Sequence, residues 1–133
     1  MKRIFVLFYF VFGVAFLTTY SLSATAQTID EITETIHSGS SKTLGKFLDD
    51  NVTLNINNTL SDFSKNQAEQ VLRNFFRKNP PKELNILHQD ESADKPWYII
   101  GKYLSKETDF KVLIKGIKQG ERLIISSIEF TKE

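Results

Sequence analysis

The sequence predicts one α+β domain in which N-terminal helices pack on a curved antiparallel sheet, and three observations lead to this prediction. Segments with helical periodicity are concentrated in the first part of the chain, before residue 80. Four segments with strand-like alternation follow, up to residue 130. The linkers between these four are short and rich in turn-forming residues, so consecutive strands should be antiparallel neighbours. Helices early and strands late are typical of an α+β domain.

Length and composition are those of an ordinary globular protein. The chain has 133 residues, of which 41% are hydrophobic and 25% charged, with 6 Gly, 3 Pro and no Cys. This length suits a single small domain. Without Cys the chain can form no disulfide, thiol nucleophile or Cys-bound metal site. The sequence also contains no Gly-rich phosphate loop, GxSxG elbow or HExxH motif, so we expect no cofactor and no metal.

Residues 1–26 have the three parts of a secretory signal peptide. Basic residues at 2–3 precede an apolar run over 4–17, and small residues at 24–26 form a cleavage site. The alternative is a transmembrane anchor, but a helix needs about twenty apolar residues to cross the hydrocarbon core. We therefore predict cleavage after Ala26, a domain comprising residues 27–133, and export to the periplasm or the extracellular space of a bacterium.

The charge balance of the expected mature domain gives no reason to predict a nucleic-acid partner. Once Lys2 and Arg3 are removed from the 17 basic residues, 15 remain against 16 acidic residues. Proteins that bind nucleic acid normally present an excess of positive charge. We also expect no membrane association after cleavage. An exported domain of this size without disulfides depends on its hydrophobic core for stability.

Two short helices are expected at the start of the domain. Thr28 and Glu31 have the spacing of a capping box, and isoleucines recur at helical spacing over residues 29–36. Gly39 can take the positive φ that ends such a helix. A second helix is predicted over residues 41–48, where apolar residues again recur at helical spacing.

A β-hairpin and a longer helix are expected next. Residues 52–56 alternate between apolar and polar, which indicates a strand with one wet face, and Asn57-Asn58 is turn sequence before a return strand over 60–63. Ser64 can cap the following helix while Gln67 reaches back to it. The apolar stripe of this helix ends with two core phenylalanines, and the helix stops at Asn79-Pro80-Pro81. The stripe consists of Ala68, Val71, Leu72, Phe75 and Phe76.

Four strands are predicted after this helix. Alternation places Tyr98 and Tyr103 on opposite faces of one strand, because they are five positions apart. Trp97 shares a face with Tyr103 by the same rule. In the preceding strand, alternation puts His88 on one face with Leu84 and Ile86. The four strands cover residues 84–89, 97–104, 110–117 and 123–130.

This order of elements resembles the cone-shaped nuclear-transport-factor-2-like fold, also called SnoaL-like, ketosteroid-isomerase-like or cystatin-like. The run SKNQAEQVLRNFFRKNPP, from Ser64 to Pro81, together with Leu87-His88-Gln89 on the next strand, is similar to a domain-of-unknown-function family of small exported bacterial proteins. The resemblance covers residues 29–132. It implies the cone fold and a location in the bacterial envelope, but a fold by itself implies no activity.

One comparison within the fold class argues against isomerase chemistry. Ketosteroid isomerases have a carboxylate base near the end of the first strand, and Asn55 stands at the corresponding position in the stretch LDDNVTLN. An amide cannot accept a proton at neutral pH. Thr53, Leu54 and Ile56 offer no base either.

Four residues remain as candidate ligand contacts, namely Asn55, His88, Tyr98 and Tyr103. A His inside the cone can act as a general base or contact a ligand, although a lone His without an acid partner is more often structural. A Tyr hydroxyl inside the cone can bind a polar group on a ligand. The alternative is that the ring fills the core and the hydroxyl lies at its rim.

The leading functional hypothesis is a non-catalytic exported binding module. Its ligand would be a small apolar molecule in the cone or an envelope protein on the exposed sheet face. Because sheet faces in this fold commonly pair two copies, a homodimer is also expected. The alternative is a small enzyme that uses His88 with a Tyr in the cone pocket, on an unknown substrate. A third possibility is an accessory subunit that binds through an apolar patch and has no pocket.

Overall fold

The computed structural model describes residues 28–92 and 95–133. The predicted signal peptide, residues 1–26, lies outside the described residues. Within the described part of the chain, no helix is both long enough and apolar enough to span a lipid bilayer.

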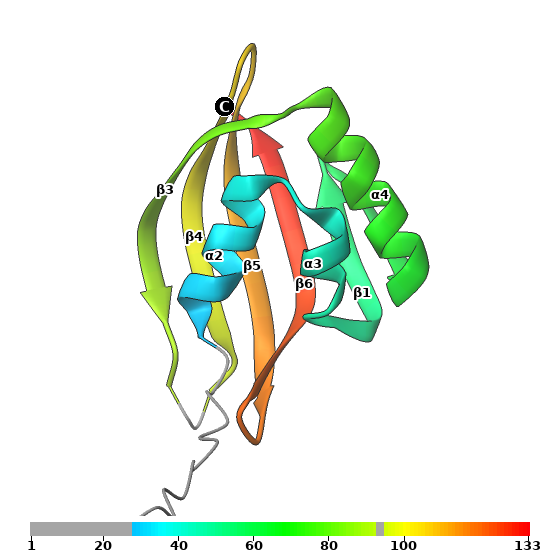
Figure 1. The fold of residues 1–133 in the computed structure, drawn as a ribbon, viewed down its shortest axis with the longest axis vertical. Helices are drawn as coiled ribbons and strands as arrows, with labels where there is room; N and C mark the ends of the chain where they lie inside the picture. The colour runs from blue at the N-terminus through cyan, green and yellow to red at the C-terminus, as the bar shows by residue number, and fades with distance from the viewer. Residues whose placement is uncertain (1–27, 93–94) are drawn as a thin grey trace, which may run out of the picture.

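The described strands form one curved six-stranded sheet, and the described helices lie on one of its faces (Figure 1). The strand order is β2-β1-β6-β5-β4-β3. Strands β3 to β6 are antiparallel neighbours, which confirms the predicted meander, whereas β1 runs parallel to β6. The predicted α+β architecture is therefore confirmed. The strands are β1 (Leu48–Ile56), β2 (Thr59–Ser64), β3 (Pro81–Asp90), β4 (Trp97–Ser105), β5 (Asp109–Gln119) and β6 (Arg122–Lys132).

The first helix has the predicted ends, but the second is shorter than predicted. Helix α2 (Ile29–Ser38) is capped by the Thr28 side chain, which accepts a hydrogen bond from the Glu31 backbone, and it ends at Gly39 with φ 68°. Helix α3 covers only Ser41–Gly45. The chain leaves the helix early because the Phe47 carbonyl accepts a hydrogen bond of 2.7 Å from the backbone N–H of Ile125 in β6. This bond directs the chain into β1 beside β6.

The hairpin and the long helix α4 (Lys65–Lys78) follow the predicted local signals. Asn57 and Asn58 have φ values of 52° and 67°, the left-handed conformation that tight hairpin turns require. Ser64 and Gln67 form a complete capping box at the start of α4. Local sequence therefore determines where the hairpin turns and where α4 begins.

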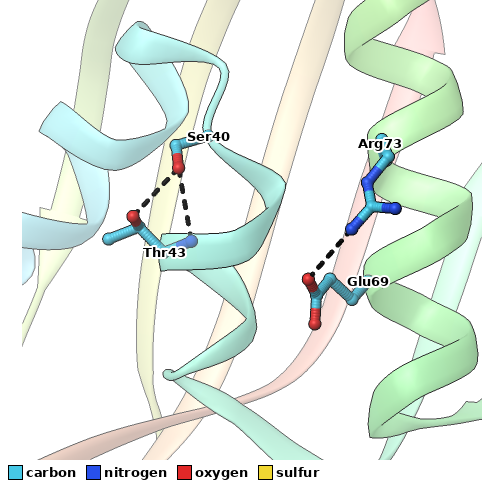
Figure 2. A network of polar contacts seen from close by, with 4 residues as sticks. All are labelled: Ser40, Thr43, Glu69 and Arg73. Carbon is cyan, nitrogen blue, oxygen red and sulfur yellow. Dashed lines mark hydrogen bonds and ion pairs between the residues drawn. The ribbon is translucent and has the colours of Figure 1, made fainter.

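Helices α3 and α4 approach closely, and Figure 2 shows polar contacts at this place. The Ser40 hydroxyl caps α3 by accepting from the Thr43 backbone and donating to the Thr43 hydroxyl, 2.9 Å away. Glu69 and Arg73 form an ion pair of 3.3 Å along α4. A Cβ at Gly45 would lie 3.0 Å from the Glu69 carboxylate, so a side chain there would require the Glu69 side chain to shift.

Five aromatic rings form the centre of the core between α4 and the sheet. Phe75 lies on α4, and its ring stacks on Phe130 of β6 with the centroids 4.1 Å apart. Tyr103 of β4 and Phe110 of β5 surround this pair, and both are fully buried. Phe76 completes the cluster. The predicted core positions of both α4 phenylalanines are confirmed, and rings occupy the space between this helix and the sheet.

Candidate functional site

The sheet face away from the helices is called the open face, and the strand register places its side chains in rows. One row crosses all six strands through Ile100, Leu113 and Glu129 at its centre. A neighbouring row contains Tyr98, Lys115 and Ser127. In order from β3 to β2, the first row is His88, Ile100, Leu113, Glu129, Asn55 and Leu60, and the second is Asp90, Tyr98, Lys115, Ser127, Thr53 and Asp62.

A hollow of about 150 Å³ lies in the open face where β2, β1, β6 and β5 meet. The Oδ1 atom of Asn55 is buried there and has no hydrogen-bond partner within the described part of the chain. The sequence singled out Asn55 as a candidate ligand contact, and the structure places it in the wall of this hollow. The hollow is lined by Thr53, Asn55, Leu60, Leu113, Lys115, Ser127, Ile128 and Glu129.

Two hydroxyl groups, one on β1 and one on β6, donate to carboxylates near the hollow. The Thr53 hydroxyl donates to Asp62 over 2.6 Å. The Thr131 hydroxyl donates to Glu129 over 3.2 Å. These bonds hold the two carboxylates in place next to the hollow. The polar groups in the wall of the hollow can form hydrogen bonds with a polar group of a ligand. The side chains of Leu60 and Leu113 provide an apolar surface beside these polar groups.

His88 lies on the open face, so the predicted face of this residue is wrong. The register of β3 against β4 shifts between Ile86, which pairs with Gly101, and His88, which pairs with Ile100. Leu87 is therefore the extra residue of a β-bulge. Because side chains alternate along a strand, one extra residue moves every later side chain to the other face. Leu84 and Ile86 pack on the core, whereas His88 is exposed to solvent.

The two candidate tyrosines lie on opposite faces of β4, as predicted. Tyr98 is half-buried on the open face, where its ring lies 5.4 Å from that of His88. Tyr103 is fully buried in the aromatic core, and its hydroxyl donates to the backbone carbonyl of Asn79. Burial raises the pKa of the Tyr103 phenol well above its usual range. The structure thus brings His88 and Tyr98 together and separates both from Tyr103.

A second hollow, of about 270 Å³, lies between the C-terminal half of α4 and the end of β1. Apolar side chains of Ile56, Val71 and Phe75 line it together with polar ones. The sequence analysis did not identify this site. Its only sequence signal is a set of three asparagines, one in the hairpin turn, one within α4 and one directly after α4. Those positions become connected only when the fold brings the turn beside α4. The polar residues of the lining are Asn57, Asn74, Lys78 and Asn79.

Comparisons with known proteins support the fold and the family. No curated protein matches the chain. A DUF4783 family protein from Bacteroides uniformis is 24% identical with a TM-score of 0.76, covering 80% of this chain and 98% of that one. Its counterpart from Bacteroides ovatus is 24% identical with a TM-score of 0.75, covering 82% and 98%.

The same comparison finds the wider fold class predicted from the sequence. An NTF2-like protein of unknown function from Shewanella baltica is 13% identical with a TM-score of 0.61, covering 78% of this chain and 90% of that one. A likeness at this level of identity supports the fold alone. The family model described as a domain of unknown function, DUF4783, matches residues 29–131. Since this match spans most of the sequence, the chain belongs to the DUF4783 family.

Proposed function

We propose that this protein is a non-catalytic binding module of the bacterial envelope, whose open face holds an envelope protein. In this proposal residues 1–26 direct export and are removed. The binding surface consists of the two rows that cross the open face, with the Asn55 hollow within them.

The observation that carries the proposal is that three of the six side chains in the first row of the open face are apolar. Ile100 and Leu113 are half-buried at its centre, and Leu60 is 68% exposed at its β2 end. Tyr98 lies beside them in the next row. Glu129 and Asn55 lie between Leu113 and Leu60 in the first row, and other polar and charged residues surround these four. An apolar centre with a polar rim and an aromatic residue is typical of protein–protein interfaces.

The helix-covered face is occupied by the chain's own core, which supports the open face as the binding surface. Aromatic rings from α4 and the sheet contact one another there, and the Tyr103 hydroxyl is bonded to the chain's own backbone. The alternative of a small enzyme required His88 and a Tyr inside the cone. That alternative loses its geometric basis, because His88 and Tyr98 both lie on the open face.

A small apolar ligand is a second candidate, and the hollow between α4 and β1 is the observation that favours it. Its apolar wall of Ile56, Val71 and Phe75 suits a hydrocarbon group, and the asparagine amides can orient a polar end. Native mass spectrometry of the protein purified gently from its own cells tests this candidate. A mass that stays bound to the folded chain and leaves on denaturation would establish a ligand.

Site-specific photo-crosslinking tests the partner protein. A photoreactive phenylalanine analogue replaces Leu113 on the open face in one variant and Lys42 on the helix side in the matched control. We expect crosslinks to a different envelope protein from position 113 and none from position 42. Crosslinks between two copies of the chain would instead establish the homodimer. Equal crosslinking from both positions, or none from position 113, would contradict the proposal.

A further inference from the structure

The hollow between α4 and the end of β1 has a lining that includes part of the protein's core. Phe75 lines it and is only 5% exposed, and the same ring stacks on Phe130. Ile56 and Val71 complete the apolar part of the lining, and both are half-buried. A hollow of about 270 Å³ that reaches the core therefore offers an apolar surface to a hydrocarbon group.

The chain's own hydrogen bonds hold both sides of this hollow. On the β1 side, the backbone N–H of Asn57 donates to the Phe130 carbonyl over 2.9 Å. On the α4 side, the backbone N–H and the side-chain amide of Asn79 donate to the Phe75 carbonyl over 2.8 and 3.3 Å. The Tyr103 hydroxyl donates in turn to the Asn79 carbonyl. Walls that are fixed before a ligand arrives lower the entropic cost of binding.

The polar part of the lining supplies hydrogen-bond donors and a single charge, which is positive. Lys78 carries this charge and forms no salt bridge within the described part of the chain. The side-chain amides of Asn57 and Asn74 lie in the same lining and form no hydrogen bond with the described residues. An ammonium group has three N–H donors and each amide has two. Because no described acidic residue lines the hollow, its polar part complements an anionic group.

Lys78 also lies where positive charge stabilises a helix, and its neighbour Arg77 separates this role from ligand binding. Both residues are exposed in the last turn of α4, where they complement the helix dipole. Of the two, only Lys78 lines the hollow. A role at the helix end predicts the same effect for both residues, whereas a ligand contact predicts an effect of Lys78 alone.

We propose that this hollow binds an aliphatic carboxylate. The hydrocarbon chain packs on Ile56, Val71 and Phe75. The carboxylate lies at the exposed rim and accepts hydrogen bonds from the Lys78 ammonium and the Asn74 amide. Pockets for whole drug-sized ligands measure about 300–1,000 Å³, so about 270 Å³ suits a chain of short to medium length. This inference rests on the small-ligand candidate of the proposed function, because it names the chemical class of that ligand.

The experiment titrates octanoate into the ¹⁵N-labelled protein and follows the side-chain amide signals of Asn57 and Asn74. Hexanoate shortens the chain, octanol removes the charge and octylammonium reverses it. We expect saturable shifts with octanoate and a Kd about tenfold weaker with hexanoate, because two buried methylene groups are lost. Octanol should bind about three- to fivefold more weakly than octanoate, since the ion pair with Lys78 is exposed. Octylammonium should bind more weakly still.

Two adjacent basic residues provide the matched test of the charge. Lys78→Gln should weaken octanoate binding about three- to fivefold and leave octanol binding unchanged. Lys78→Arg should keep octanoate binding. Arg77→Gln removes the same charge one residue away, outside the lining, and should change neither probe.

Two adjacent positions on α4 test the apolar wall. Val71→Phe fills the hollow and should abolish the binding of both octanoate and octanol. Gln70→Phe makes the same addition at an exposed position outside the lining and should leave both unchanged. Thermal unfolding followed by circular dichroism checks that both variants fold. If Val71→Phe does not fold, the chain-length series and the Lys78 and Arg77 variants still decide the inference.

The outcomes separate this inference from the candidate on which it rests. No saturable shift with octanoate, a Kd independent of chain length, or equal effects of Lys78→Gln and Arg77→Gln overturns the inference. If native mass spectrometry finds a neutral bound molecule and octanoate does not bind, the small-ligand candidate stands and the carboxylate is wrong. If octanoate binds with all the expected dependences but the native mass is clean, the site is confirmed and the candidate is contradicted.

Discussion

The two faces of the same sheet differ in what their side chains do. Residues of β4 that point toward the helices, such as Trp97 and Tyr103, are at most 1% exposed. Their neighbours on the other face, such as Tyr98 and Ile100, remain half-buried. One residue along a strand is therefore enough to move a side chain from the core to the surface where we propose that a partner binds. Stability is thus carried by one set of alternate positions on these strands, and the binding that we propose would use the other set.

The helix-covered face packs against Phe75 of α4, where we expect the largest effect. Phe75→Ala removes the ring that stacks on Phe130 and should lower the free energy of unfolding by about 3–5 kcal/mol. The matched change on the open face, Leu113→Ala, should cost about 1 kcal/mol, because that side chain is only half-buried. Urea unfolding followed by circular dichroism measures both. Equal losses would show that the open face is part of the core.

Gly116 should give the next largest effect. A Cβ at this position would lie 2.0 Å from the Ile124 carbonyl oxygen and 2.3 Å from the Trp97 ring, so the ring or the β5–β6 pairing must move. Gly116→Ala should cost about 1–3 kcal/mol in urea unfolding, with a change in Trp97 fluorescence.

The control for Gly116 is a glycine with open space. Gly120 has φ 61° and nothing within 4 Å of an added Cβ. Because asparagine tolerates this backbone conformation, Gly120→Asn should cost less than Gly116→Ala. The opposite order would show that backbone conformation matters more than crowding by Trp97.

Removing the hydroxyl group of Tyr103 or of Tyr98 compares what one hydroxyl contributes to stability on each face. Tyr103→Phe removes the hydrogen bond to the Asn79 carbonyl and should cost about 1 kcal/mol, whereas Tyr98→Phe should change stability little. Burial raises the pKa of Tyr103, so above about pH 10 the folded chain keeps a proton that the unfolded chain loses. Stability should therefore fall as pH rises beyond that point.

Alkaline unfolding tests this assignment. Chemical unfolding at several pH values above neutrality should show a decline for the native chain and for Tyr98→Phe. Tyr103→Phe should lose part of that decline. A decline that is the same in all three proteins would assign it to other groups.

The smallest effect on stability is expected at Leu60, which is 68% exposed. Leu60→Ser should change the free energy of unfolding by less than about 0.5 kcal/mol. The same change should reduce crosslinking of the partner from position 113, because it removes the apolar side chain at the β2 end of the first row. An unchanged crosslinking yield would limit the binding surface to β4, β5 and β6.

Much of the fold could be predicted from the residues because its signals are local. The turn at Asn57-Asn58, the capping box at Ser64 and the C-cap at Gly39 depend on neighbours within a few positions. The opposite faces of Tyr98 and Tyr103 follow from alternation in a strand without a bulge. The end of α3 could not be predicted in this way, because a distant strand, through Ile125, draws Phe47 out of the helix.

The candidate sites were less predictable. Asn55 was singled out by its position in the first strand, but its buried oxygen depends on the packing of β2, β1, β6 and β5 around it. The hollow beside α4 joins residues from a turn and a helix that no sequence pattern connects.

By itself the sequence determined the family, the element order and the core positions of Phe75 and Phe76, since hydrophobic spacing and capping act over short distances. Only the tertiary structure decided which face His88 occupies. The bulge at Leu87 arises where β3 pairs with β4, and one inserted residue reverses all later side chains. It also decided that Asn55 lies in a hollow with an unpartnered oxygen, because burial and hydrogen bonding depend on strands that are far apart in the chain.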